Sequence, residues 1–211
     1  MSPPAPDARL TGVWVKDPSR SDPLDEAMDA MQLGGLTRTA VRLVRGLELD
    51  VRGGSRFELA VFSVVPWFKV RERYPLDGSE VQCGRRDLRR GKHSGSVAVQ
   101  PDGSLLLSFT WGEPFAGSGY DHLAVVPAAT LAAAAVAPAP ADPTEAGASA
   151  GGDSSGAGAA AAAAEPGSGG ASGGGGGGEV LVVTSVMKVG GAAGGACRTV
   201  TYRTVYVRGR T

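Results

Sequence analysis

The fold of this chain is decided by residues 28–38, which have the sequence Met28-Asp29-Ala30-Met31-Gln32-Leu33-Gly34-Gly35-Leu36-Thr37-Arg38. The glycine pair in the middle of this stretch separates two short amphipathic segments, which predicts a helix-turn-helix. A short strand-like segment precedes the stretch at 12–16, and only strand-like segments follow it. An all-β chain seldom inserts helices so early, so this order of elements restricts the fold more than any single residue does.

The first helix is predicted to begin near Asp22. Asp22 can cap the helix, and Pro23 has the φ angle of a first helical position. One apolar face follows at helical spacing and consists of Leu24, Ala27, Met28 and Met31.

The second helix is predicted to begin at Leu36 or Thr37 and to run to Gly46. Its apolar face consists of Leu36, Ala40, Leu43 and Val44, and its opposite face carries Arg38, Arg42 and Arg45. These three cations either make transient contact with an anionic membrane or form an ordinary solvated helix face.

After residue 46 the hydrophobic period changes from 3.6 to 2, which predicts strands. We expect them at 47–52, 56–64, 67–74, 79–83, 94–100, 104–111, 119–126, 179–189 and 197–208, in addition to 12–16. Ten strands joined by hairpins have to close into a barrel or split into two packed sheets, since long open edges invite aggregation. The early helix pair favours closure, because it has a natural place over an open barrel end. The predicted fold class is therefore all-β, a ten-stranded antiparallel up-and-down barrel with a helix-turn-helix lid between strands 1 and 2.

One segment has a composition that does not fit a folded barrel. Residues 128–178 consist almost entirely of Ala, Gly, Ser and Pro and contain no aromatic side chain. Such a segment cannot offset the entropy of ordering its backbone by burying side chains, so we expect a disordered insert in a hairpin loop. The barrel domain would then comprise residues 1–127 and 179–211.

Charge and cysteine content restrict the partners. The formal net charge is zero, from 21 basic and 21 acidic residues, so no global field draws the chain toward nucleic acid or anionic lipid. The two cysteines, Cys83 and Cys197, lack metal-ligand spacing and fit reduced thiols in a cytosol-like compartment, with a disulfide between them as the alternative. No signal-peptide pattern and no apolar window of about 18 residues occurs. We expect a cytoplasmic monomer without nucleic-acid partners; a plastid address stays open.

Four segments carry a family resemblance. In chain order they are Gly12-x-Trp14, the lid from Glu26-x-Met28-x-Ala30 through Gly35-x-Thr37-Arg38, the hairpin Pro101-Asp102-Gly103-Ser104 leading to Trp111-Gly112, and the end from Val186-Met187-Lys188 through Tyr206. In this order they resemble the intracellular lipid-binding proteins, the fatty-acid- and retinoid-binding barrels of the lipocalin, or calycin, group. The resemblance implies a water-containing internal cavity, a helical portal, and non-enzymatic transport of a small hydrophobic ligand such as a fatty acid, without a cofactor.

The last strand departs from that family, whose carboxylate-binding pair is usually Arg-x-Tyr. Period 2 places Arg198, Tyr202 and Tyr206 on one face here. We expect Arg198 and Tyr202, supported by Tyr206, to bind a ligand carboxylate. Alternatively, Arg198 is a solvated strand-end residue and Tyr202 a core aromatic. The family also stacks a last-strand Arg on the first-strand Trp, and Arg203 or Arg198 would take that role here beside Trp14.

The apolar alternation identifies candidate walls and a candidate portal. We expect the ligand to contact Phe57, Leu59, Phe68, Leu107, Phe109 and Trp111. The portal residues are Met28, Met31 and Leu36, which either gate access or simply cover the barrel mouth. The same alternation would also fit a solid sandwich core.

Two features support alternative functions. The basic run 85–93 lacks aromatic stacking residues, so we expect an exposed loop rather than a nucleic-acid site; a ligandless interaction module would use this loop. The only imidazoles are His93 and His122, and neither lies in a catalytic or metal-binding motif. We therefore expect no enzyme, with a haem-binding or catalytic barrel that uses His122 as the alternative.

Overall fold

The computed structural model of the protein describes residues 4–64, 69–86, 89–131, 178–190 and 196–209. The chain divides into one unit of Met1–Ala128 with Gly178–Thr211 and a second unit of Ala129–Gly177. The barrel and its lid belong to the first unit. Phe68 and nearly all of the expected insert lie outside the described residues.

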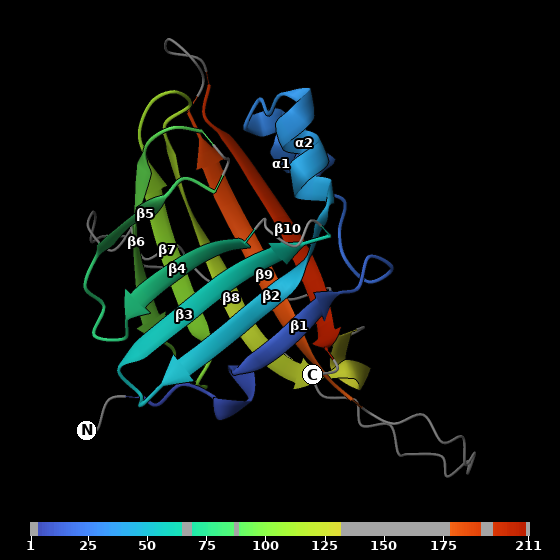
Figure 1. Cartoon of the computed structure of the whole chain (residues 1–211), viewed down its shortest axis with the longest axis vertical. Helices are drawn as coiled ribbons and strands as arrows, with labels where there is room; N and C mark the ends of the chain where they lie inside the picture. Colours follow the sequence, from blue (N-terminus) through green and yellow to red (C-terminus); the bar gives the residue numbers. More distant parts are fainter. Residues whose placement is uncertain (1–3, 65–68, 87–88, 132–177, 191–195, 210–211) are drawn as a thin grey trace, which may run out of the picture. The chain divides into compact units, whose positions relative to one another are not determined.

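The described residues form one ten-stranded antiparallel sheet that curls into a nearly closed barrel (Figure 1). Its strands are β1 (Gly12–Lys16), β2 (Val44–Arg52), β3 (Arg56–Ser63), β4 (Lys69–Pro75), β5 (Val81–Gly84), β6 (Lys92–Val99), β7 (Leu105–Trp111), β8 (Gly117–Pro127), β9 (Glu179–Val189) and β10 (Arg198–Arg208). Each strand pairs with its neighbour in the chain except β4 with β5, and β1 pairs with β10. The predicted all-β barrel and its strand order are confirmed.

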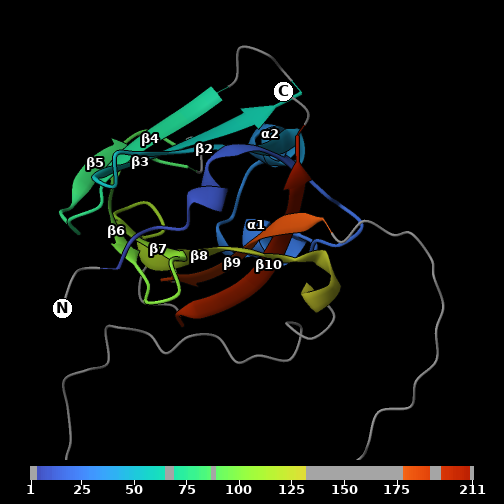
Figure 2. The same ribbon diagram turned by 90° about the horizontal axis from the view of Figure 1, so that it is seen from below.

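Two walls of the barrel face each other across the interior. Strands β2, β3 and β4 lie on one side and β6 to β9 on the other (Figure 2). The register places Leu59 of β3 beside Glu72 of β4, and Leu107 of β7 beside Asp121 of β8. Because alternate residues of a strand share a face, these two pairs point inward, as do the fully buried Phe57 and Leu105. The interior therefore contains charged groups as well as apolar ones.

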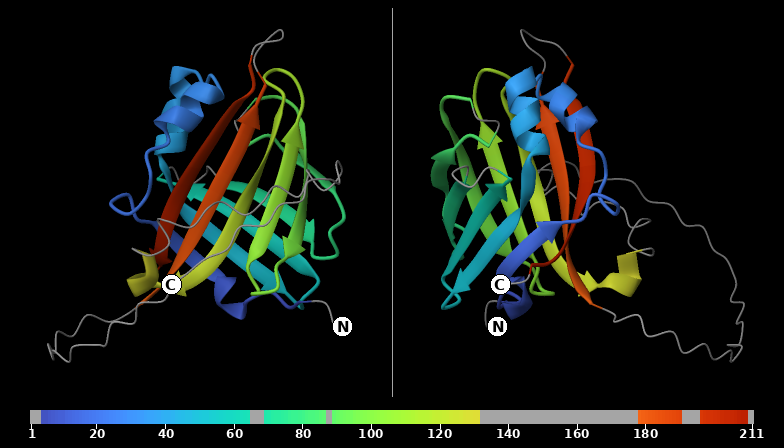
Figure 3. Two further views of the ribbon diagram at one scale, coloured as in Figure 1. Left: turned by 180° about the vertical axis from the view of Figure 1, so that it is seen from behind. Right: turned by 45° about the vertical axis from the view of Figure 1, so that its right-hand side comes forward.

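Two helices lie between β1 and β2, as predicted, at the end of the barrel opposite to the N-terminal segment (Figures 1 and 3). They are α1 (Asp25–Ala30) and α2 (Gly35–Arg42). The prediction that Asp22 caps the first helix is wrong. Its carboxylate instead accepts a hydrogen bond at 2.7 Å from the backbone N–H of Arg203. Helix α2 ends at Arg42 rather than at Gly46, because the chain from Val44 onward pairs with β3.

The opposite end of the barrel is closed by a buried aromatic plug. The 3-10 turn η1 (Ala8–Leu10) buries Leu10 completely, next to the equally buried Trp14 of β1. The indole N–H of Trp14 donates a 2.8 Å hydrogen bond to the carbonyl of Leu10. This pairing satisfies the polar atom of the indole, which lets the whole ring serve as core.

Arg208 completes the closed end. Its guanidinium lies 4.1 Å from the centre of the Trp14 ring, a cation–π distance. The prediction that Arg203 or Arg198 stacks on this tryptophan is therefore wrong. The reason is register, since Arg208 is the β10 residue that lies opposite Trp14.

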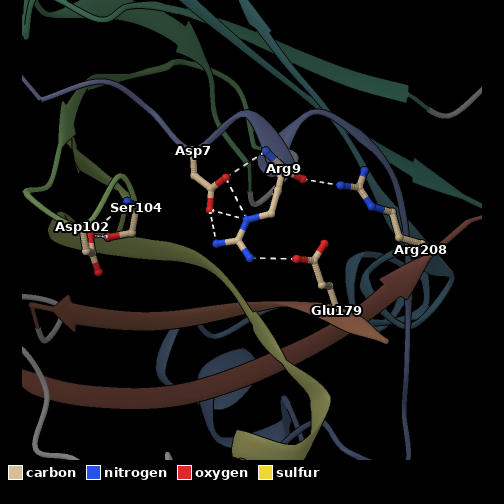
Figure 4. A network of polar contacts seen from close by, with 6 residues as sticks. All are labelled: Asp7, Arg9, Asp102, Ser104, Glu179 and Arg208. Atoms are coloured by element: carbon tan, nitrogen blue, oxygen red, sulfur yellow. Dashed lines mark hydrogen bonds and ion pairs between the residues drawn. The ribbon is translucent and has the colours of Figure 1, made fainter. Parts of the chain in front are cut away.

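A polar network ties the chain ends to this closure (Figure 4). Arg9 forms ion pairs with Asp7 and with Glu179 at the start of β9, both at 2.7 Å. The guanidinium of Arg208 donates a hydrogen bond to the backbone carbonyl of Arg9. The N-terminal segment is thereby joined to β9 and to β10.

Candidate functional site

Two adjoining cavities lie inside the barrel next to the lid. The first, here called the lid cavity, has a volume of about 160 Å³ and is lined by residues that include Met28, Met31, Phe109 and Trp111. The second, here called the wall cavity, has a volume of about 200 Å³ and is lined by residues that include Lys16, Leu59, Thr204 and Tyr206. Both cavities contact Leu24, Val41, Arg86, Asp121 and Tyr202. The shared residues place the two cavities side by side.

Most of the predicted ligand residues line these cavities. Met28, Met31, Phe109 and Trp111 line the lid cavity, Leu59 and Tyr206 the wall cavity, and Tyr202 both. Phe57 and Leu107 are fully buried in the core and line neither cavity. Leu36, a predicted portal residue, is 92% exposed and also lines neither cavity.

Arg198 does not enter the barrel. Its side chain is 51% exposed and forms a 3.2 Å ion pair with Glu26 of α1. Arg198 is the first residue of β10 and lies opposite Val189, the last residue of β9. Its side chain is therefore at the rim of the barrel rather than in the interior. Period 2 correctly placed Arg198 on the face of Tyr202 and Tyr206, but only the two tyrosines reach the interior.

Arg86, which follows β5, places its cation inside the barrel. Its Nη2 atom donates a 2.6 Å hydrogen bond to Glu72 of β4, and its Nη1 atom donates one of 2.5 Å to Asp121 of β8. The side chains of these acids are only 2% and 12% exposed. Arg86 therefore joins the edge strand β4 to the opposite wall of the barrel.

Hydroxyl groups support both carboxylates. The phenol of Tyr74 donates a 2.9 Å hydrogen bond to Glu72, and the hydroxyl of Ser185 donates one of 2.6 Å to Asp121. Burial raises the pKa of Glu72, but the charge and hydrogen bonds of Arg86 outweigh it, so the pKa lies below its usual value. Glu72 is therefore ionised at neutral pH.

His93 of β6 lies beside this cluster. Its Nε2 atom is 3.3 Å from the Tyr74 hydroxyl and 3.7 Å from Glu72. Burial lowers the pKa of His93 despite the nearby carboxylate, so the imidazole is neutral at pH 7. The interior cluster of Arg86, Glu72, Asp121 and His93 thus has a formal charge of −1.

The prediction that residues 85–93 form an exposed loop is wrong for three of them. Arg85 is 6% and His93 3% exposed, and Arg86 bonds to interior acids. One sequence signal pointed to this arrangement. Glu72 is two residues from Val70, on the apolar face of its strand, and an inward carboxylate requires a cation or hydrogen-bond donors.

The alternative haem residue, His122, lines neither cavity. It alternates with the inward residues Asp121 and Leu123, and its Nε2 atom lies 2.7 Å from the hydroxyl oxygen of Ser104. In the described part of the chain, no group of three or more His, Cys, Asp or Glu residues is placed to hold a metal ion. Among the same residues, no helix is long and apolar enough to cross a membrane.

The solved structures that resemble this chain include the following three. A REP1-NXSQ fatty acid transporter matches with a TM-score of 0.55 and 12% identity, over 97% of this chain and 99% of that one. A fatty-acid-binding protein of Schistosoma mansoni, in complex with arachidonic acid, matches with a TM-score of 0.51 and 11% identity, over 96% and 98%. Fatty-acid-binding protein 1 of Echinococcus granulosus matches with a TM-score of 0.50 and 12% identity, over 94% and 96%.

These similarities show the fold, which is that of fatty-acid-binding proteins. No family model matches the sequence, and no curated protein matches it significantly. The ligand therefore has to be argued from the residues of the interior.

Proposed function

We propose that this protein binds and transports a small hydrophobic ligand, such as a fatty acid, inside the barrel. The observation that carries the proposal is the pair of adjoining cavities beneath the lid, whose walls include Met28, Leu59, Phe109 and Trp111. Likeness to fatty-acid-binding barrels, one of them solved with arachidonic acid, supports the same class of ligand.

The size of the cavities favours one ligand that extends through both. Sites for small molecules commonly have volumes of about 300–1,000 Å³, and each cavity alone is smaller. Tyr202 and Val41 border both cavities, so modest movement of the side chains and of α2 would join them. The lid then has to move when the ligand enters or leaves.

The interior polar groups support binding without catalysis. Arg86 bonds to Glu72 and Asp121, and hydroxyl groups of the barrel complete the hydrogen bonds of these acids. Groups that bind one another in this way stabilise the barrel rather than activate a substrate. We propose a non-enzymatic carrier on these grounds; its cytoplasmic location and monomeric state stay predictions.

Contact of the lid with an anionic membrane stays a prediction. Two of the three arginines expected there form ion pairs inside the lid, Arg38 with Asp29 and Arg42 with Asp25. Arg45 and Leu36 are exposed and would be the first groups to meet a lipid surface.

The proposal is tested by native mass spectrometry of freshly purified protein and by displacement of the apolar fluorescent probe N-phenyl-1-naphthylamine. Ala27→Trp places an indole in the lid cavity, so we expect the probe to bind much more weakly. Ala98→Trp makes the same change at an exposed position of β6 and should bind the probe like the unmodified protein. If acyl, isoprenoid and haem compounds all fail to displace a probe, ligand transport is excluded; a Soret band would instead identify a haem-binding barrel.

A further inference from the structure

Lys16 is a cation in the wall of the barrel interior. It is the last residue of β1, lies two positions after the inward-facing Trp14, and lines the wall cavity. Within the described part of the chain, its side chain forms no hydrogen bond and no ion pair. Lys16 therefore differs from Arg86, whose donors bind two carboxylates.

The ammonium group of Lys16 itself is partly removed from water. Burial lowers the pKa of Lys16 below its usual value. A side chain that buried only its carbon chain and kept its ammonium group in water would not show this shift. A partly buried charge without a counter-charge is unfavourable, and an anionic ligand group would relieve that cost.

Two hydroxyl groups line the same cavity as this cation. Tyr206 lies opposite Lys16 in the β1–β10 register, and Tyr206 and Thr204 line the same cavity. Burial raises the pKa of Tyr206, so its phenol keeps its proton at neutral pH. The hydroxyl groups of Tyr206 and Thr204 lie close enough to interact, and each can donate a hydrogen bond to a ligand.

The other cations are poorly suited to bind an anion. The guanidinium of Arg86 already donates hydrogen bonds to Glu72 and Asp121, so it has little capacity left to bind a ligand carboxylate. Arg198 lies at the rim and pairs with Glu26. Arg85, which lines the lid cavity, donates hydrogen bonds to the backbone carbonyls of Gly112 and Pro114. Lys16, in contrast, lines the wall cavity and forms no side-chain hydrogen bond or ion pair within the described part of the chain.

On the basis of the proposed function, we infer that the ligand is a hydrophobic carboxylic acid whose carboxylate binds Lys16 and the hydroxyl pair of Tyr206 and Thr204. The apolar part of the ligand then packs against the walls of the wall cavity and the lid cavity. The head group lies on the β1–β10 side of the interior. Of the last-strand residues predicted to bind the carboxylate, this site includes Tyr206 but neither Arg198 nor Tyr202.

The test compares dodecanoic acid, dodecanol and dodecylamine as competitors of N-phenyl-1-naphthylamine on the full chain. We expect the unmodified protein to prefer the acid over the alcohol and the amine. Lys16→Met should weaken the acid about 10- to 100-fold, the range for a lost hydrogen bond to a charged group, and leave the alcohol unchanged. Lys92→Met, the same change at an exposed position of β6, should alter none of the three.

Each outcome has a distinct meaning. Equal affinity of the unmodified protein for acid and alcohol overturns the inference, and so does an equal loss of both in Lys16→Met. Preference for the amine would assign ligand recognition to the negative cluster around Arg86 instead. If no competitor displaces the probe, or the probe itself does not bind, the proposed function fails. Where Lys16→Met does not fold, Tyr206→Phe decides, because it removes only a hydroxyl and should weaken the acid selectively.

Discussion

The charges of Arg86, Glu72 and Asp121 depend on one another, since the cation lies between the two acids. Glu72 accepts guanidinium hydrogen bonds of 2.6 and 2.8 Å, and Asp121 accepts one of 2.5 Å. Both acids are largely buried, so their ionised forms are stable only next to a counter-charge. At the scale of single residues, Arg86 is therefore expected to matter more for folding than for binding.

We expect Arg86→Met to lower the free energy of unfolding by about 3 kcal/mol, because two buried carboxylates lose their cation. Urea unfolding, followed by tryptophan fluorescence, measures this change. The matched control is Arg73→Met, which removes a cation whose side chain is 63% exposed in a pair with Glu58. That variant should lose less than about 1 kcal/mol. Equal losses in the two variants would contradict a structural role for the interior cluster.

At the scale of elements, the lid is joined to the barrel by a contact from the segment between β5 and β6. The guanidinium of Arg89 donates hydrogen bonds of 2.9 and 3.0 Å to the backbone carbonyls of Met31 and Gln32, just after α1. The same guanidinium lies 4.5 Å from the centre of the Phe115 ring. These contacts hold the end of α1 over the lid cavity, which Met31 lines.

Arg89→Gln should make the lid open more often. We expect the association and dissociation rates of a bound probe each to rise about 10-fold, since hydrogen bonds from a charged donor are lost only in the closed state. The dissociation constant should change little, and stopped-flow fluorescence measures both rates. Arg90→Gln makes the same change at the neighbouring exposed position and should leave both rates unchanged. A change in affinity without a change in rates would mean that Arg89 contacts the ligand rather than the lid.

The elements could be predicted from sequence where their signals are local. Leu105, Leu107 and Phe109 alternate within one strand, and period 2 placed all three inside. The start of the first helix could not be predicted in this way, because Asp22 bonds to Arg203 of β10, which is remote in sequence. Arg86 was missed for the same reason, since its acids lie 14 and 35 residues away in the chain. A charged run is usually solvated, and only the assembled barrel reveals that this one supplies an interior cation.

At the scale of the whole molecule, the two ends of the barrel have different roles. Trp14, Leu10 and Arg208 close one end with buried and stacked contacts. The other end is covered by α1 and α2, whose side chains also line the cavities. Strands β8 and β9 run between these ends and remain paired up to Pro127 and Glu179. The long Ala- and Gly-rich segment therefore starts and ends where the barrel is already closed.

Replacing residues 132–177 by about six Gly and Ser residues should leave the barrel intact and ligand binding unchanged. The two ends are already adjacent, since the N–H of Ala128 donates a 2.9 Å hydrogen bond to the carbonyl of Gly178. The cost of closing a loop falls by about 0.6 kcal/mol for each halving of its length, so the free energy of unfolding should rise by about 2 kcal/mol. Urea unfolding and probe titration measure the two quantities. A scrambled segment of the original length is the control and should behave like the unmodified protein. Lower stability or weaker binding in the shortened chain would mean that the segment makes contacts that the barrel needs.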